Sequence, residues 1–202
     1  MADTILDDQF VRDYEPLTIA STYKNGANRG NAIVPTSAAA VLFDPLRDAE
    51  IAGAADAAGS KTSFVSATLA ALALGNDFIN GMPCQVVRGD GTDVAETVVT
   101  DYVDATGACT LLPLPWAVAA ADVLTVLGYP LITQGDATVT IGGDDGNEVT
   151  LDTSESDAHS YTNKSGNGRV ANNRGQRVAI FYLTFSATRK DTCRATYNVL
   201  PR

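Results

Sequence analysis

The sequence predicts a mainly β protein, in which a small antiparallel β-barrel or sandwich follows an extended N-terminal arm and precedes a second β-rich region. From Lys61 onward, short apolar runs of strand length alternate with turn residues, a pattern typical of all-β domains. No long segment shows the apolar period of a helix. We therefore expect an arm with a short helix over 1–59, a barrel over 60–130 and a β-rich region over 131–202.

Composition predicts a globular, soluble chain that is made in a cytoplasm. The 202 residues are 45% apolar and 19% charged, and a chain of this length can bury a core. No stretch approaches the roughly 20 apolar residues of a membrane span. The first ten residues, MADTILDDQF, are acidic where a signal peptide would be basic, so we expect no export signal.

The region 1–59 is expected to hold little regular structure. Residues 1–35 mix charges with NGANRGN and lack sustained periodicity, which indicates an extended arm with short strands that docks on a neighbour. The run PLRDAEIAGAA opens on Pro45, and proline suits the first turn of a helix. We expect a short helix there, limited by Gly53 and Gly59.

Strand-like runs continue from residue 61 to the C-terminal end. Turn residues at 89–91 and 104–107 separate runs of the barrel, and the polar stretch 154–176 reads as one exposed loop. Loops of that length are usually functional or become ordered against a partner. The expected strand runs are TSFVSATLAAL, MPCQVVRG, AETVVTDYV, ACTLLPL, DVLTVLG, ATVTIGG, NEVTLDT, RVAIFYLTF and RATYNVL.

Few residues offer catalytic or cofactor chemistry. His159, the only histidine, stands beside Ser160 and Asp157, and neighbours in sequence do not make a catalytic relay. The acidic turn at 144–148 could offer oxygen ligands to calcium but lacks the full spacing of an EF-hand loop, so a solvated turn is favoured. The GDGTD run at 89–93 has no following lysine for a phosphate loop. We expect no enzyme activity and no cofactor.

The three cysteines are expected to be reduced and buried. Cys84, Cys109 and Cys193 stand far apart, without the paired spacing of a zinc site, and an odd number cannot all form disulfides. Unpaired cysteine is also among the most buried residue types. We therefore expect structural thiols, which suits assembly in a cytoplasm.

Charge is distributed unevenly along the chain. Residues 164–202 contain eight basic groups and one acid, a net charge of +7, while the rest contains 6 basic and 23 acidic groups, a net charge of −17. Such segregation can steer one copy onto another or onto an acidic partner, although solvated strand faces are the alternative. The acidic remainder opposes nucleic-acid binding. The expected partner-binding residues are Arg169, Arg174, Arg177, Arg189 and Lys190.

Residues 60–128 contain three runs in order: DFINGM, CQVVRGDGTDVAETVVTDYVDATGACTLLPLPW and AADVLTVL. Together these runs resemble a small β-module found repeatedly in structural proteins of tailed bacteriophages, although TDVAE replaces the small, glycine- and glutamine-containing stretch usual after the glycine pair. The tryptophan is expected to cap the barrel. The residues that carry the resemblance, all of them scaffold positions, are Asn80, Gly81, Met82, Gly89, Gly91, Tyr102, Trp116 and Asp122.

The resemblance implies a component of a virion. Short strands and an acidic, alanine-rich body favour a capsid decoration or cement protein that binds the major capsid protein on the outer shell. The same features suit a neck, tail or fibre adaptor. A carbohydrate-binding β-domain is the alternative of another class, although sugar sites usually show exposed aromatic residues and this chain has one tryptophan. We expect a symmetric homo-oligomer, for example a trimer.

Overall fold

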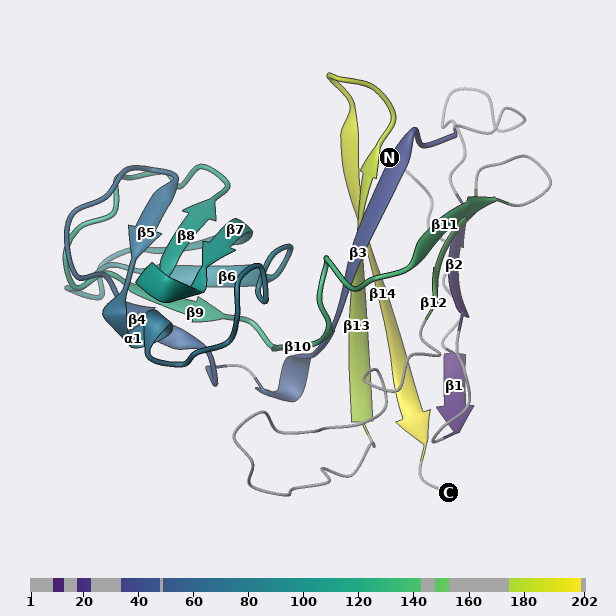
Figure 1. The fold of residues 1–202 in the computed structure, drawn as a ribbon, viewed down its shortest axis with the longest axis horizontal. Coiled ribbons are helices and arrows are strands. Elements are labelled where there is room, and N and C mark those ends of the chain that lie inside the picture. The colour runs from purple at the N-terminus through teal and green to yellow at the C-terminus, as the bar shows by residue number, and fades with distance from the viewer. Residues whose placement is uncertain are drawn as a thin grey trace. The chain divides into compact units, whose positions relative to one another are not determined.

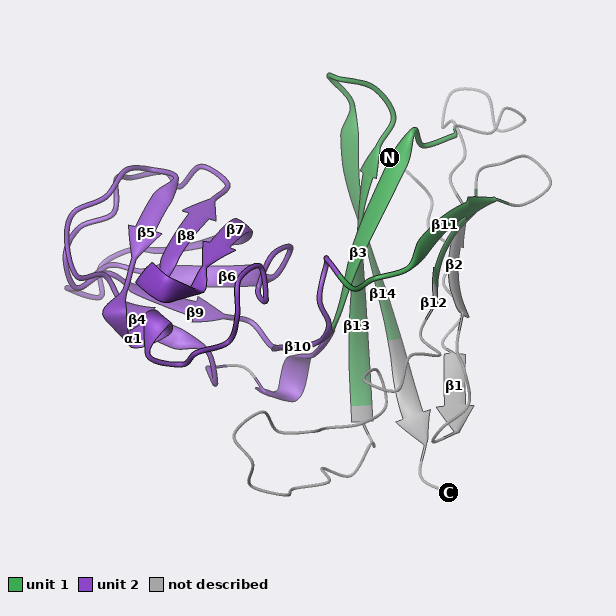
Figure 2. Cartoon of the chain, viewed as in Figure 1, with its two compact units in different colours: residues 1–42, 136–202 green, residues 43–135 purple. Residues whose placement is uncertain are grey.

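The computed structural model divides the chain into two compact units (Figure 2). Unit 1 comprises residues 1–42 and 136–202, and unit 2 comprises residues 43–135, so unit 2 is inserted into unit 1 as one continuous stretch. The structure describes residues 9–12, 18–22, 34–47, 49–142, 148–152 and 175–200. Strands dominate these residues, which confirms the expected mainly β fold. Helical residues among them are confined to η1 (Pro45–Arg47), α1 (Ala67–Ala70) and η2 (Asp104–Thr106).

The described strands of unit 1 form two sheets (Figure 1). In the first, β14 (Lys190–Leu200) lies between β1 (Gln9–Arg12) and β13 (Gly175–Thr184), and β3 (Ser37–Asp44) follows β13. The second sheet has β12 (Glu148–Asp152) between β11 (Val139–Gly142) and β2 (Thr18–Thr22). β1 runs parallel to β14, whereas β2 is antiparallel to β12.

These pairings change the interpretation of the N-terminal arm. We expected residues 1–35 to dock on a neighbour, but β1 and β2 add to sheets of their own chain. The rest of the expected arm, at 1–8, 13–17 and 23–33, lies outside the described residues. The two described strands of the arm therefore belong to unit 1, and docking of the arm on a neighbour stays a prediction.

The core of unit 1 is built around β13. Val178, Ala179 and Phe181 are fully buried, so neighbouring positions that point to opposite faces of the sheet are both covered. A strand that is buried on both faces reads as a continuous apolar run, which explains the RVAIFYLTF sequence. By contrast, exposed residues of β14 alternate with half-buried or buried ones along Lys190–Ala195.

Unit 2 is a curled antiparallel sheet (Figure 1). Its strand order is β4, β9, β6, β7, β8, β5, and every neighbouring pair is antiparallel. The strands are β4 (Ala52–Ala54), β5 (Ser63–Val65), β6 (Pro83–Val87), β7 (Val94–Val103), β8 (Ala108–Leu111) and β9 (Val123–Val126). A register shift in β7 between Val99 and Asp101 marks a bulge, a feature that bends a strand.

One continuous segment, residues 51–65, supplies both edge strands of this sheet. Between β4 and β5 the segment follows the connection from β8 to β9. The Ala55 N–H donates to the Asp122 carbonyl at 2.7 Å, and the Gly59 N–H donates to the Val118 carbonyl at 2.9 Å. The segment thus remains hydrogen-bonded as it passes from one edge of the sheet to the other.

The two ends of segment 51–65 also meet each other. The Asp56 N–H donates to the Val65 carbonyl at 3.0 Å, which joins the end of β4 to the end of β5. Gly53 lies so close to Ser66 that a Cβ at position 53 would overlap the serine hydroxyl. One backbone hydrogen bond therefore joins the two edges of the curled sheet, which we call the barrel, and a glycine at position 53 allows the close approach.

Along the strands of this barrel, buried side chains alternate with less buried ones on the outer face. On β6, Cys84 and Val86 are fully buried, while Pro83, Gln85 and Val87 are half-buried on the other face. Phe64 from β5 and Leu69 from α1 are also fully buried. The alternation of apolar residues with period two in the sequence thus predicts which side chains form the core of the barrel.

The chain enters and leaves unit 2 at neighbouring points. A Cβ on Gly128 would overlap the Phe43 ring, so the first and last parts of unit 2 are packed together. The Arg47 guanidinium lies 3.8 Å from the centroid of the Tyr129 ring, where a cation is attracted by the aromatic face. Tyr129 begins β10 (Tyr129–Ile132). Adjacent ends are what allow a folded unit to be inserted into another chain segment.

Two local predictions are wrong. The expected helix over 45–55 is one 3₁₀ turn, because Ile51 is buried in the barrel and residues 52–54 pair with β9. The run TSFVSATLAAL was expected to be one strand, but it is a short strand followed by α1. The Ser66 hydroxyl caps this helix, because it accepts a hydrogen bond from the Leu69 N–H at 3.4 Å. The expected runs from MPCQVVRG onward each contain a strand.

The expected regional boundaries also differ from the observed ones. We expected divisions after residues 59 and 130, whereas the units divide after residues 42 and 135. The first boundary is displaced because segment 51–65 belongs to the barrel. In the described ranges, no helix is long and apolar enough to cross a membrane.

We expect Gly53→Ala to destabilise the barrel by about 1–3 kcal/mol, the usual cost of overpacking a core. The added methyl would overlap Ser66 Oγ and lie 3.0 Å from Leu69 Cγ. Urea denaturation measures the change. Gly142→Ala is the matched control, because no atom lies within 4 Å of a Cβ there. Equal losses of stability in the two variants would contradict the closure at Gly53.

Candidate functional site

The corner that precedes β6 is a structural device. The Asn80 side-chain amide donates to Asp77 Oδ1 at 2.8 Å, and Gly81 has a positive φ of 78°. The Gly81 N–H donates to the Val99 carbonyl at 2.8 Å, and the Val99 N–H donates to the Met82 carbonyl at 3.0 Å. Glycine adopts this φ without steric cost. The asparagine–glycine–methionine motif therefore turns the chain and pairs it with β7.

The turn between β6 and β7 is held by its own residues. The Gly91 N–H donates to the Arg88 carbonyl at 2.8 Å, and the Arg88 N–H donates to the Asp93 carbonyl at 2.9 Å. Asp90 Oδ1 accepts from the hydroxyl of Thr92 at 2.7 Å and from its N–H at 3.0 Å. These bonds favour the carboxylate and lower the pKa of Asp90.

A buried carboxylate, Asp122, connects this turn to the rest of the barrel. Its side chain is 1% exposed; Oδ1 accepts from the Gly89 N–H at 3.0 Å and Oδ2 accepts from the Ala119 N–H at 2.9 Å. Its backbone carbonyl accepts from Ala55, within the closing segment. A Cβ at Gly89 would lie 2.9 Å from the Ala121 carbonyl oxygen, so the close approach favours glycine. Asp122 thus joins three loops at one end of the barrel.

Two aromatic motif residues lie in other parts of the barrel. The buried Tyr102 hydroxyl lies 3.1 Å from the Leu69 carbonyl and 3.2 Å from Asp104 Oδ1, linking β7 to the end of α1. Burial raises the pKa of Tyr102, so the hydroxyl stays protonated. Half-buried Trp116 stacks with Arg88, whose guanidinium carbon lies 5.0 Å from the ring centroid. Trp116 therefore packs against the β6–β7 turn, as a residue at the barrel end would.

The three cysteines are buried and form no disulfide, as the sequence predicts. Burial is the main cause that raises the pKa of both Cys84 and Cys109 to about 12. A thiol with such a pKa is almost wholly protonated near neutral pH and is a poor nucleophile. Cys193 is also buried, in β14. These thiols pack in the two cores and do not form a reactive site.

Several candidate residues lie outside the described ranges. These are His159, the loop over 154–174, and residues 144–147 of the acidic turn considered for calcium; Glu148 is the exposed first residue of β12. Within the ranges that the structure describes, no group of three histidine, cysteine, aspartate or glutamate side chains could hold a metal ion. The solvated turn favoured by the sequence at 144–148 stays a prediction.

Three of the five basic residues expected to bind a partner are described by the structure, and these three do not form one surface. Arg169 and Arg174 lie outside the described residues, while Arg189 and Lys190 are exposed. The prediction that Arg177 binds a partner is wrong. Arg177 is 1% exposed, and one of its guanidinium nitrogens donates to the neighbouring Gln176 carbonyl at 3.1 Å. A residue enclosed in the core of unit 1 cannot present its charge to a partner.

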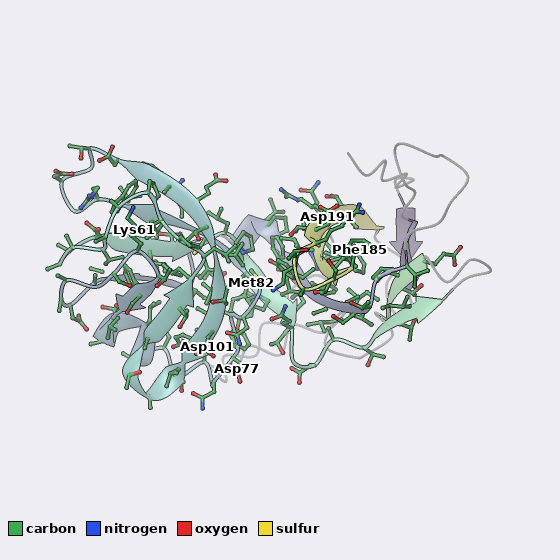
Figure 3. All side chains as sticks on the ribbon, turned by 90° about the horizontal axis from the view of Figure 1, so that it is seen from above. Lys61, Asp77, Met82, Asp101, Phe185 and Asp191 are labelled. Atoms are coloured by element: carbon green, nitrogen blue, oxygen red, sulfur yellow. The ribbon has the colours of Figure 1, made fainter. Side chains whose placement is uncertain are left out.

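Charge is also distributed differently from the sequence expectation. Unit 2 contains eleven acidic and three basic residues, a net charge of −8. Unit 1 contains thirteen acidic and eleven basic residues, a net charge of −2, because it combines the acidic N-terminal region with the basic C-terminal region. Two acids of unit 2, Glu96 and Asp101, are exposed on β7, and Figure 3 labels Asp101. Unit 2 therefore carries most of the net negative charge of the chain.

Comparison with protein-family models, with curated proteins and with solved structures finds no match to this chain. A functional proposal therefore rests on the residues of the chain itself. Two kinds of feature bear on it: motif residues that hold the barrel together, and charged strand faces that both units expose.

We expect Asp122→Ala to lower the free energy of unfolding by about 1–3 kcal/mol, because two partly buried N–H groups lose their acceptor. Asp122→Asn keeps one side-chain oxygen and should lose less. Guanidinium denaturation gives both values. Asp101→Ala is the control, because this carboxylate is exposed on the same sheet. A midpoint for Asp122→Ala equal to that of the control would show that the carboxylate does not brace the barrel.

We expect Cys84 and Cys109 to resist a disulfide reagent at pH 8, where a thiol of pKa about 12 is only about one part in ten thousand deprotonated. Absorbance at 412 nm follows the reaction, and peptide mass spectrometry locates the label. In guanidinium all three cysteines should react within minutes. Rapid labelling of either barrel cysteine in the native protein would contradict this expectation.

Proposed function

We propose that this chain is a non-enzymatic structural protein of a bacteriophage virion, and that it decorates and cements the outer surface of the capsid. The observation that carries the proposal is that the motif residues make contacts inside the barrel and stabilise its fold. Gly81 and Asp122 hold backbone in place, the Asn80 side chain bonds to the Asp77 side chain within the corner, and Tyr102 ties a strand to a helix. A module built in this way is a scaffold, and its outer strand faces are the surfaces that it offers to partners.

The division into two units supports a linking role. Each unit has its own buried core, around β13 in unit 1 and inside the barrel in unit 2. A chain with two separately packed bodies can contact two neighbours at once, and a cement protein must do this between capsomers. The net charge of −8 on unit 2 favours a partner surface that is basic or contains exposed cations.

The partners in this proposal are the major capsid protein and other copies of the chain. The protein would be made in the host cytoplasm and would reside in the virion. A head–tail neck, tail or fibre adaptor would use the same scaffold, but such adaptors occupy one vertex and do not follow the shell lattice. The two roles therefore differ in the number of copies per particle.

We expect purified virions to contain hundreds of copies of the chain, because a decoration protein repeats with the capsid lattice. Quantitative mass spectrometry, scaled to the major capsid protein, gives this number. A count of about six or twelve would contradict decoration and favour the adaptor. Absence of the chain from purified particles would contradict the virion proposal altogether.

A further inference from the structure

An exposed row of small apolar side chains crosses the outside of the barrel. Val94 lies opposite Val87, Val87 lies opposite Val123, and Val123 lies opposite Ala54 in the strand register. Residues that are directly opposite in antiparallel strands point to the same face. Val94 is 55% exposed and Val123 is 36% exposed, so this face is the outer one. We name these four residues the valine row.

Acidic side chains flank the valine row. Asp90 and Asp93 are exposed in the turn that leads to Val94, and Glu96 follows Val94 by two positions on β7. Residues two apart on a strand share a face, so Glu96 lies beside the row. Arg88 is the only base in the same hairpin, and its guanidinium stacks with Trp116. A partner for this surface therefore needs apolar contact together with positive charge.

The hairpin of β13 and β14 in unit 1 exposes a surface of the opposite kind. Lys190, Thr192 and Arg194 alternate along β14 and are all exposed. Tyr182, half-buried on β13, lies opposite Thr192 and therefore shares this face. An aromatic ring thus lies on the same face as two cations. We name these four residues the basic strand face; Asp191, labelled in Figure 3, is next to Lys190 and belongs to the other face of the strand.

We propose that the basic strand face of one copy docks on the valine row of a second copy. Tyr182 would lie on the valines, where aromatic anchors contribute most to interfaces, and the two cations would meet Asp93 and Glu96. The partner is inferred to be a second copy of the chain, because every copy carries both the acidic valine row and the basic strand face, and these surfaces have complementary charge. The inference does not depend on the virion proposal.

The contact would be head to tail. Two valine rows cannot pair with each other without placing their flanking acids together, and two basic strand faces would likewise repel. A contact between two different surfaces leaves one of each unoccupied in a dimer, so association continues into a closed ring or an open chain of subunits. Oppositely charged side chains also make the contact sensitive to salt.

Charge reversal on each surface tests this contact in the full-length protein. Lys190→Glu with Arg194→Glu makes the strand face acidic, and Asp93→Lys with Glu96→Lys makes the flank of the valine row basic. The side chains of Asp93 and Glu96 are exposed, and Asp93 contributes to the turn through its backbone carbonyl, which a change of side chain leaves in place. Sedimentation velocity at low salt measures association, and circular dichroism melting verifies that each variant is folded.

We expect the wild-type protein to associate, each double variant alone to associate at least about tenfold more weakly, and an equimolar mixture of the two to recover association. Recovery follows because both contacts in the mixture again join opposite charges. The matched control is Asp101→Lys with Glu148→Lys, which changes net charge as the row variant does at exposed sites outside both surfaces. It should associate like the wild type.

Several outcomes would overturn the proposal. A wild-type protein that remains monomeric up to high micromolar concentration has no such contact. Double variants that associate as strongly as the wild type would show that these charges are not in the interface. Two weakened variants that do not recover on mixing would show that the reversed residues do not face each other, as would equal weakening by the control.

Discussion

Backbone hydrogen bonds from residues 51–65 join the two edges of the barrel sheet, and the other features of unit 2 depend on this closure. β4 and β5 are three residues each and could not stabilise an edge alone, since an unpaired edge exposes donors and acceptors. The hydrogen bond from the Asp56 N–H to the Val65 carbonyl joins the two edges of the sheet around the core side chains. The carboxylate of Asp122 then becomes buried between the β6–β7 turn and the closing segment, where its hydrogen bonds matter most.

The closed barrel determines where interactions with other molecules can take place. Its inward positions and its connections are used for packing and for internal hydrogen bonds, which leaves the outer strand faces for contacts. One such face combines the valine row with acidic residues, and unit 1 exposes a strand face with the opposite charge. This arrangement suits an assembly protein, which needs more than one adhesive surface. The proposed virion role and the proposed contact between copies both depend on these exposed strand faces, but neither proposal requires the other.

Sequence reasoning predicted the strands with clear alternation, such as β6, because Cys84 and Val86 alternate with less buried residues. It missed β4, since the sequence AGA has low strand propensity and is held there by its partner strand. It placed Arg177 on a surface, although the adjoining apolar run signals a strand buried on both faces. The insertion of residues 43–135 could not be predicted, because it depends on pairings between distant segments.

Hydrogen exchange followed by NMR tests the closure most directly in the full-length protein. The amides of Ala55, Asp56 and Gly59 donate to carbonyls of the barrel, and if they close it they must open with it. We expect these three amides to be as strongly protected as those of β6 in the centre of the sheet. Exchange orders of magnitude faster than in β6 would show that residues 51–59 detach from the barrel, as a separate N-terminal arm would.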